Sequence, residues 1–236
     1  MPLPTLVTPE FRTKIPSTGE EIKYRPFLVK EEKLLFMANE SDNTSDVVDA
    51  IKQILKNCIL THVEIDELAS FDLEYLFLKL RSKSVGEVVE FKLKHQNNDE
   101  CDHVTTVEVN LDSIEIDEIK KEDKIIELTD VLGVKMKYPS LKTIEEYDIT
   151  QISTMDEMIE LLVRCIEVVY DEETVYDNFT NKEMKEFIES FSTEQFGKVN
   201  EFINKMPKLR KEISYKCKKC GVEETRVIEG LHNFFT

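Results

Sequence analysis

The N-terminal part of the chain alternates between apolar and polar positions in two short stretches. Residues 11–15 and 21–25 both alternate in this way, which is typical of half-buried strands, and residues 16–19 between them have the composition of a turn. Pro26 then ends the pairing, and residues 30–38 combine good helix formers with an apolar cluster. We therefore predict a hairpin followed by a helix.

Helical spacing replaces the alternation in the next segment. One predicted helix follows the cap candidates at residues 43–46, and its apolar stripe is formed by Val47, Ile51, Ile54, Leu55 and Cys58. Another helix is expected to begin near Ser70 and to end before Gly86. From residue 87 the period is two, so residues 88–94 and 104–109 predict a second hairpin with a long polar tip at 95–103.

The second half of the chain is predicted to be mostly helical. Residues 125–128 and 134–138 indicate a third strand pair, and helical spacing over residues 155–169 places apolar side chains and Cys165 on one face. Residues 180–183 have the form of a capping box, and Thr193 begins a further helix. The tail, residues 212–228, has the order strand, Cys-x-x-Cys-Gly, strand.

These elements place the chain in the α+β class, as a helical body with short antiparallel hairpins. Two hairpins are zinc-ribbon-like, with the order strand, knuckle, strand. We expect a hairpin and helix in residues 1–40, helices and the middle hairpin in 41–120, and a strand pair, helices and the Cys-x-x-Cys hairpin in 121–236. Because no Pro/Gly/Ser-rich linker occurs, one compact body is predicted. The order helices, strand, polar tip, strand occurs around residues 43–110 and again around 155–228, which suggests an internal duplication.

Charge and composition narrow the class of protein. The 236 residues include 31 Lys and Arg against 48 Asp and Glu, which gives a formal net charge of −17. Since affinity for a nucleic-acid backbone comes mostly from basic side chains, this excess argues against nucleic-acid binding and favours protein partners. No run of about 18 apolar residues and no signal-peptide pattern occurs, so neither a membrane-spanning segment nor standard secretion is expected. The five Cys, an odd number, fit a reducing compartment.

The most specific chemical motif is Cys217-x-x-Cys220-Gly221, between two short predicted strands. Such a turn directs two thiolates at one point, and a structural zinc needs two further ligands. The tip of the middle hairpin offers Cys101 with His95 or His103. We therefore predict one structural zinc, bound by Cys217, Cys220, Cys101 and one histidine, assigned to His95. A knuckle that has lost its metal is the alternative, and a redox pair is a third, which the flanking strands disfavour because redox Cys-x-x-Cys motifs begin helices.

Other patterns carry less chemical information. Residues 205–220 have seven basic side chains and one acidic, a local charge of +6, which fits either a docking site for an acidic partner or nucleic acid, or, as we favour, a solvated face that offsets the acidic surface. The four His among the 48 acids form no distinguishable catalytic pair, and the sequence contains neither a G-x-S-x-G nor a phosphate-binding glycine motif. We predict that the chain is not an enzyme.

Parts of the sequence resemble a family of baseplate proteins from T-even-type contractile-tailed phages. These parts are residues 22–35, IKYRPFLVKEEKLL, and the ending, in which Cys217-x-x-Cys220-Gly221 is followed by EGLHNFF at 229–235. The resemblance also includes the helical middle, so it extends over essentially the whole chain. Members tend to carry a second Cys pair in the middle hairpin, where this sequence has Cys101 and His95 or His103.

This resemblance implies a role in building the baseplate hub, as a subunit or as an assembly factor, without covalent catalysis. It implies that the partners are other phage baseplate hub proteins, first in the cytoplasm of the infected bacterium and then in the virion tail baseplate. Tyr24, Arg25 and Phe27, together with Phe234 and Phe235, are the predicted partner contacts, although the two terminal phenylalanines also fit a segment folded back onto the core. The competing hypothesis is a zinc-ribbon regulator that binds nucleic acid.

Overall fold

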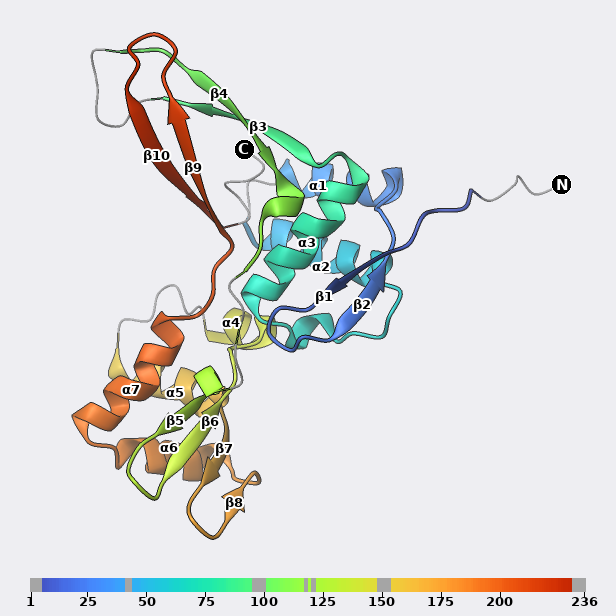
Figure 1. The fold of residues 1–236 in the computed structure, drawn as a ribbon. Helices are drawn as coiled ribbons and strands as arrows, with labels where there is room; N and C mark the ends of the chain where they lie inside the picture. The colour runs from blue at the N-terminus through green and yellow to red at the C-terminus, as the bar shows by residue number, and fades with distance from the viewer. Residues whose placement is uncertain are drawn as a thin grey trace, which may run out of the picture. The chain divides into compact units, whose positions relative to one another are not determined.

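The chain divides into two compact units that are built from discontinuous segments (Figure 1). The structure is a computed structural model, which describes residues 6–40, 44–94, 101–116, 119, 122–147 and 154–230. Unit 1 comprises Met1–Ile65, Phe71–Asp117 and Lys208–Thr236, and unit 2 comprises Asp66–Ser70 and Glu118–Pro207. Helices and short antiparallel sheets confirm the predicted α+β class. The predicted division at residues 40 and 120 and the packing into one body stay predictions.

Unit 1 combines three helices with three two-stranded hairpins in the part of the chain that the structure describes. The helices are α1 (Val29–Asn39), α2 (Thr44–Cys58) and α3 (Ser70–Ser84), with the short 3-10 turn η2 (Leu111–Ser113). A second 3-10 turn, η1 (Ile65–Glu67), begins in unit 1 and continues into the segment that belongs to unit 2. The hairpins pair β1 (Phe11–Lys14) with β2 (Glu21–Tyr24), β3 (Val88–Leu93) with β4 (Thr105–Asn110), and β9 (Arg210–Lys216) with β10 (Glu223–Glu229). All three hairpins lie where the sequence predicts them, two from period-two alternation and the third from its order of strand, Cys-x-x-Cys-Gly and strand.

Helix α3 is central to unit 1, because apolar side chains all around its axis are buried. These are Phe71, Leu73, Leu76, Phe77, Leu78 and Leu80. The predicted apolar stripe of α2 is also buried, with Ile54, Leu55 and Cys58 at most 1 % exposed. Burial of this size supplies the main driving force for the fold, at roughly 1.5–3 kcal/mol for each fully buried large aliphatic or aromatic side chain.

An ion pair between Arg25 and Glu31 connects the N-terminal hairpin to helix α1. Arg25 Nη2 lies 3.1 Å from Glu31 Oε1, and the Glu31 side chain has no exposed surface. The other carboxylate oxygen accepts the backbone N–H of Leu28 at 2.9 Å, which satisfies one of the donors at the start of α1. Burial alone would raise the pKa of Glu31, but the hydrogen bonds from Arg25 and Leu28 outweigh it and lower the pKa below its ordinary value of 4.5.

Replacing this carboxylate by an amide is expected to destabilise unit 1. Glu31→Gln leaves the guanidinium of Arg25 without its charged partner, which costs about 1–3 kcal/mol of unfolding free energy at neutral pH. Because the folded-state pKa of Glu31 is lowered, its contribution is present above the unfolded pKa and is lost as the pH falls through the folded pKa. Urea unfolding at several pH values should therefore show a difference between wild type and variant that shrinks below about pH 4. A difference that is constant with pH would contradict this account.

Unit 2 is a four-stranded antiparallel sheet with helices. Its strands have the order β5-β6-β7-β8. They are β5 (Ile125–Glu127), β6 (Gly133–Met136), β7 (Ile166–Tyr170) and β8 (Val175–Tyr176). The helical elements are η3 (Glu122–Lys124), α4 (Leu141–Tyr147), α5 (Met155–Cys165), α6 (Asn181–Glu189) and α7 (Thr193–Asn204). The core lies between the sheet and these helices and includes Val134, Leu162, Cys165 and Val199, none of which is exposed. Of the described helices, none is long and apolar enough to cross a membrane.

The predicted helix over residues 155–169 is wrong in its last turn. Helix α5 ends at Cys165, and residues 166–170 form strand β7, which pairs with β6 and β8. The run Ile-Glu-Val-Val-Tyr is rich in β-branched and aromatic residues, and its apolar positions fit a helical face and a buried strand equally well. The predicted capping box is confirmed, since Thr180 Oγ1 accepts the N–H of Glu183 and the Glu183 carboxylate accepts that of Thr180.

Strands β6 and β7 meet at a glycine that an aromatic ring covers. Gly133 lies opposite Tyr170, and a Cβ built on Gly133 would lie 2.2 Å from Tyr170 Oη and 2.3 Å from Tyr170 Cζ. No side chain fits there unless the tyrosine ring moves. The absence of a Cβ at Gly133 therefore allows the ring to cross the sheet at this position.

Two glycine substitutions in unit 2 are expected to have opposite effects. Gly133→Ala should lower the unfolding free energy by about 1–3 kcal/mol, because the ring of Tyr170 is displaced. Gly197→Ala should raise it by about 0.5–1 kcal/mol, because Gly197 lies within α7 with no atom within 4 Å of the added Cβ. Thermal or urea unfolding measures both changes. Equal effects of the two variants would show that the Tyr170 contact is unimportant.

Candidate metal centre

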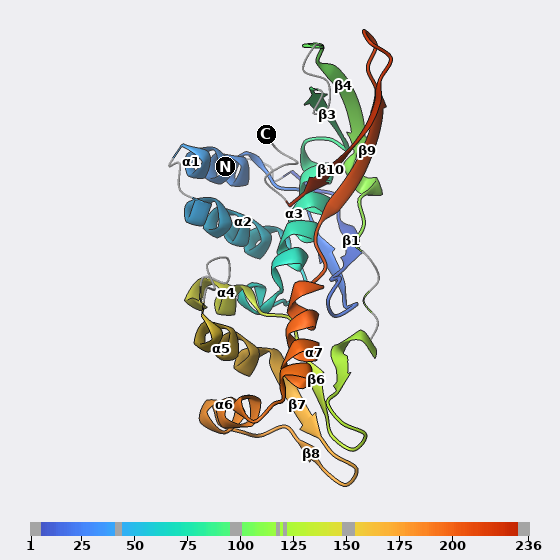
Figure 2. The same cartoon turned by 90° about the vertical axis from the view of Figure 1, so that its left-hand side faces the viewer.

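The middle hairpin (β3–β4) and the C-terminal hairpin (β9–β10) lie against each other in unit 1, although the sequence separates them by more than 90 residues. Their likeness to zinc ribbons stays a prediction. Strands β4 and β9 are in contact, and both hairpins extend away from the helices in the two views (Figures 1 and 2). Near the tips, the carbonyl oxygen of Lys94 accepts hydrogen bonds from Tyr215 Oη at 3.2 Å and Arg226 Nη2 at 2.9 Å. Tyr215 and Arg226 thus fix the C-terminal hairpin to the end of β3. The sequence does not predict this role, since nothing in the pattern of the strands identifies the partner of Tyr215 or Arg226.

The loop between β9 and β10 has the backbone of a tight knuckle. The N–H of Cys217 donates to the carbonyl of Val222 at 2.9 Å, and the N–H of Gly221 donates to the carbonyl of Cys217 at 2.9 Å. Gly221 has a φ of +76°, in the left-handed region that glycine adopts without strain. The N–H of Lys219 also donates to Cys217 Sγ at 3.4 Å. The turn therefore holds both knuckle cysteines on one side, as the sequence predicts.

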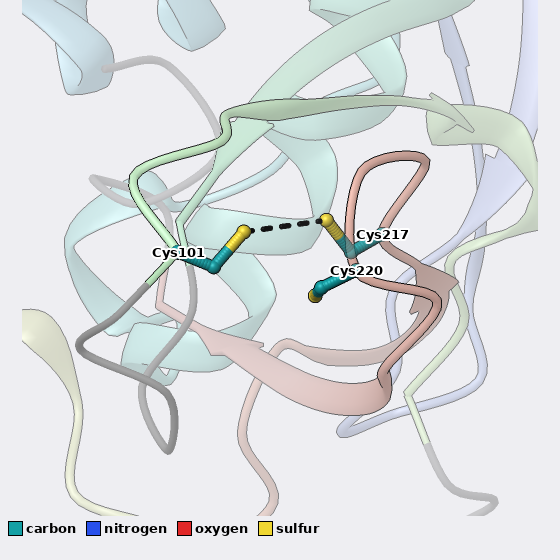
Figure 3. A group of neighbouring side chains, drawn as sticks. All are labelled: Cys101, Cys217 and Cys220. Carbon is teal, nitrogen blue, oxygen red and sulfur yellow. Dashed lines mark hydrogen bonds between the residues drawn. The ribbon is translucent and has the colours of Figure 1, made fainter.

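Three cysteine sulfurs meet where the two hairpin tips come together. The sulfur atoms of Cys101, Cys217 and Cys220 all lie within 4.8 Å of one another, and those of Cys101 and Cys217 are 4.0 Å apart. Figure 3 shows the Cys101 side chain extending from the middle hairpin towards the two cysteines of the knuckle. Cys101 and Cys217 are buried, whereas Cys220 is exposed. The structure therefore places Cys101 beside the knuckle, while its role as a metal ligand stays a prediction.

The spacing of these sulfurs is that of ligands around one metal ion. A tetrahedral zinc with Zn–S bonds of about 2.3 Å holds its sulfur ligands about 3.8 Å apart. The measured separations differ from this value by about one ångström or less, a distance that side-chain rotation covers. Thiol sulfur is also the donor that zinc prefers in structural sites. The donor set and its geometry both fit the ion.

The closeness of the three thiols affects the pKa of Cys220. A backbone N–H of Val222 lowers the pKa of Cys220, but desolvation and hydrogen bonds with the thiols of Cys217 and Cys101 outweigh it, so that the pKa is raised. A divalent cation reverses this preference, because it binds the thiolate form and expels the proton. The remaining cysteines are separate from the cluster: burial raises the pKa of Cys58 to about 11 and that of Cys165 to about 12, as expected for inert core thiols.

Of the two histidines in the tip of the middle hairpin, the structure describes His103. His95, the predicted fourth ligand, lies outside the described residues. His103 is described and half-buried, and it does not belong to the group of metal-ligating side chains that the three cysteines form. Three of the four predicted ligands are thus brought together.

The geometry of the site is complemented by comparisons with known proteins. The model of the family "T4 bacteriophage base plate protein" matches residues 8–236, nearly the whole chain. The chain belongs to this family of baseplate proteins. The chain is also 24 % identical over 228 residues, 96 % of its length and 98 % of the relative's, to the baseplate hub assembly protein gp26 of Enterobacteria phage T4. No solved structure matches.

Three of the residues that were predicted to contact baseplate partners lie in the described part of unit 1. There they make contacts within the unit. Tyr24 and Phe27 are 4 % and 8 % exposed and belong to the core, and burial raises the pKa of Tyr24 to about 12. Arg25 pairs with Glu31 and donates a further hydrogen bond to the carbonyl of Asn57 at 3.0 Å. Their role in partner binding stays a prediction. Phe234 and Phe235 lie outside the described residues.

Proposed function

We propose that this baseplate family member acts in assembly of the central hub of a contractile tail, through contacts with other hub proteins and without a covalent reaction. The observation that carries the proposal is the family match over residues 8–236, supported by the relative whose name describes a hub assembly protein. The place of action is the cytoplasm of the infected bacterium and then the tail baseplate of the virion.

The charge of the chain supports this role in physical terms. A net charge of −17 makes two copies repel each other and attracts partners that present basic surfaces. An assembly component gains from both effects, because a subunit that polymerises alone would be lost to the ordered assembly.

Inactivating the gene is expected to stop the assembly of complete baseplates. A phage without a working copy should give few or no infective particles in cells that carry an empty plasmid, and expression of the wild-type chain from that plasmid should restore them. Electron microscopy of lysates identifies the missing structure: hubs should be absent, while heads are made normally. Normal tails in the absence of the chain would contradict the proposal.

We further infer that one structural zinc ion joins the two hairpin tips, with Cys101, Cys217 and Cys220 as ligands and His95 as the fourth. The support is the close approach of three sulfurs from segments more than 100 residues apart. Zinc in such a site binds only thiolates and neutral imidazole, holds the hairpins in a fixed orientation and contributes directly to the folding free energy.

Metal analysis of the protein tests this site. Mass spectrometry of chain purified without added zinc should find about one zinc per chain, since structural sites bind with high affinity. Cys101→Ser and Cys217→Ser should each lose it. Cys58→Ala is the matched control, because it removes a buried thiol outside the cluster and should retain the metal.

The same measurement on His95→Ala and His103→Ala distinguishes the fourth ligand. Loss with the former alone supports the assignment to His95, and loss with the latter alone reassigns the ligand. Absence of zinc from the wild-type chain would overturn the metal site while leaving the assembly role intact.

The nucleic-acid-binding alternative is not favoured. In the basic segment, Lys216 pairs with Glu223 at 2.9 Å and Lys208 pairs with Glu229 at 2.9 Å. Acids of the neighbouring strand thus offset part of this basic charge, as expected for the solvated face that the sequence favours. A gel shift at low salt, where phosphate contacts are strongest, would reveal binding if this conclusion were wrong.

A further inference from the structure

Two turns project from the same end of the sheet in unit 2. Strand pairing places Glu127, Gly133, Tyr170 and Val175 in one row across β5, β6, β7 and β8. The β5–β6 turn and the β7–β8 turn both leave the sheet at this row, and they extend in the same direction in both views (Figures 1 and 2). With strands about 4.8 Å apart, the row is about 14 Å wide. We call residues 127–133 and 170–177 together the hairpin-tip surface.

The hairpin-tip surface exposes apolar side chains. Val131 is 50 % exposed, Val175 is 66 % exposed and Tyr176 is 47 % exposed. Single exposed apolar residues are ordinary, but these come from two turns that the sheet brings to one end. Together they give this end of the sheet exposed apolar side chains from both turns.

The turns hold these side chains in fixed positions. The N–H groups of Leu128 and Thr129 both donate to the carbonyl of Leu132, at 2.9 and 3.0 Å, while Thr129 Oγ1 accepts the N–H of Leu132 at 3.0 Å. In the other turn, the Asp171 carboxylate accepts the N–H groups of Glu173 and Thr174 and the hydroxyl of Tyr176, at 2.8–3.0 Å. An ordered surface loses little conformational entropy when it binds, which favours affinity.

The charge around this surface has one sign. Residues 127–133 and 170–177 include six acids and no Lys or Arg. The acids are Glu127, Asp130, Asp171, Glu172, Glu173 and Asp177. A nearby base, Lys198, donates to the carbonyl of Glu127 and pairs with Glu194 of its own helix. Repulsion among these carboxylates raises the free energy of the unbound protein. A partner with opposite charge reduces this repulsion when it binds.

We propose that the hairpin-tip surface docks another baseplate protein, through a patch on that protein with an apolar centre and a rim of Lys and Arg. This inference rests on the proposed assembly function, and it names the surface and the partner chemistry. Charge complementarity selects a basic partner, while Val131, Val175 and Tyr176 supply the desolvated centre that such interfaces need. A symmetric pair of copies joined through this surface is disfavoured, because it would bring the same carboxylates together.

A charge variant with a matched control tests the docking surface in the complementation assay. The tip variant removes four charges that hold no turn: Asp130→Asn, Glu172→Gln, Glu173→Gln and Asp177→Asn. The control removes four exposed helical charges from the same unit: Glu186→Gln, Glu189→Gln, Glu194→Gln and Glu201→Gln. Both change the net charge by the same amount. The tip variant should reduce the complementing titre by about tenfold or more relative to the control, the effect of losing about 1.4 kcal/mol of binding.

A second variant and a cross-linking experiment test the apolar part of the surface and the identity of its partner. Val131→Ser with Val175→Ser should reduce the titre similarly, with an unchanged melting temperature. A photo-reactive benzoylphenylalanine at position 175, in infected cells, should form an adduct with a baseplate protein other than this chain, at a peptide rich in Lys and Arg.

Different negative results contradict different parts of the proposal. Equal titres for the tip variant and its control would overturn the docking surface, as would adducts formed only between copies of this chain. If the empty plasmid supports as many particles as the wild-type chain, the assembly function itself is wrong.

Discussion

The pairing of two distant hairpins is the constraint on which unit 1 depends. Its segments lie on both sides of unit 2 in the sequence, and the contacts that return the tail to β3 and β4 join residues 116 and 132 positions apart. Closing a flexible loop of this length costs chain entropy on the order of 4–5 kcal/mol. The C-terminal hairpin offsets this cost with few groups, because only one face of β9 is buried, at Ile213 and Tyr215. A two-stranded ribbon is marginal by itself, so a metal at its tip would stabilise unit 1 more than another apolar contact.

Side chains of the types that are common in protein interfaces are buried in unit 1, whereas unit 2 exposes small aliphatic side chains. Tyr24, Arg25 and Phe27 are the residue types that dominate interfaces, yet here they close the N-terminal hairpin onto the helices. The residues that unit 2 displays, Val131 and Val175, are small aliphatics whose importance comes from their place on ordered turns. Residue type alone therefore does not show which side chains are exposed on this chain; the tertiary structure is needed as well.

Much of the fold follows from local rules that act within a few residues. Alternation identifies the hairpins, and the reciprocal hydrogen bonds of Thr180 and Glu183 mark the start of α6. The cysteine cluster was also predictable, because thiolates of one knuckle need further ligands and the other polar tip supplies Cys101. Strand β7 was not, since the spacing of Ile166 and Val169 fits a helical face, whereas the β-branched composition of residues 166–169 fits a strand buried on both faces, and the pairing with β6 decides between them. The partner of Arg226 depends on a tertiary contact that no local pattern encodes.

The distribution of charge explains why an acidic assembly component needs a specific docking surface at all. Exposed pairs such as Lys216 with Glu223 contribute at most about 1 kcal/mol each, and they offset part of the positive charge of the C-terminal hairpin. What remains is a molecule whose negative potential attracts a basic partner from many directions. Such attraction raises the rate of encounter without selecting an orientation. Orientation requires apolar groups that must be desolvated together, and within unit 2 the two turns hold such groups in a fixed arrangement inside the acidic rim. The rim therefore guides approach, and Val131, Val175 and Tyr176 define the bound geometry.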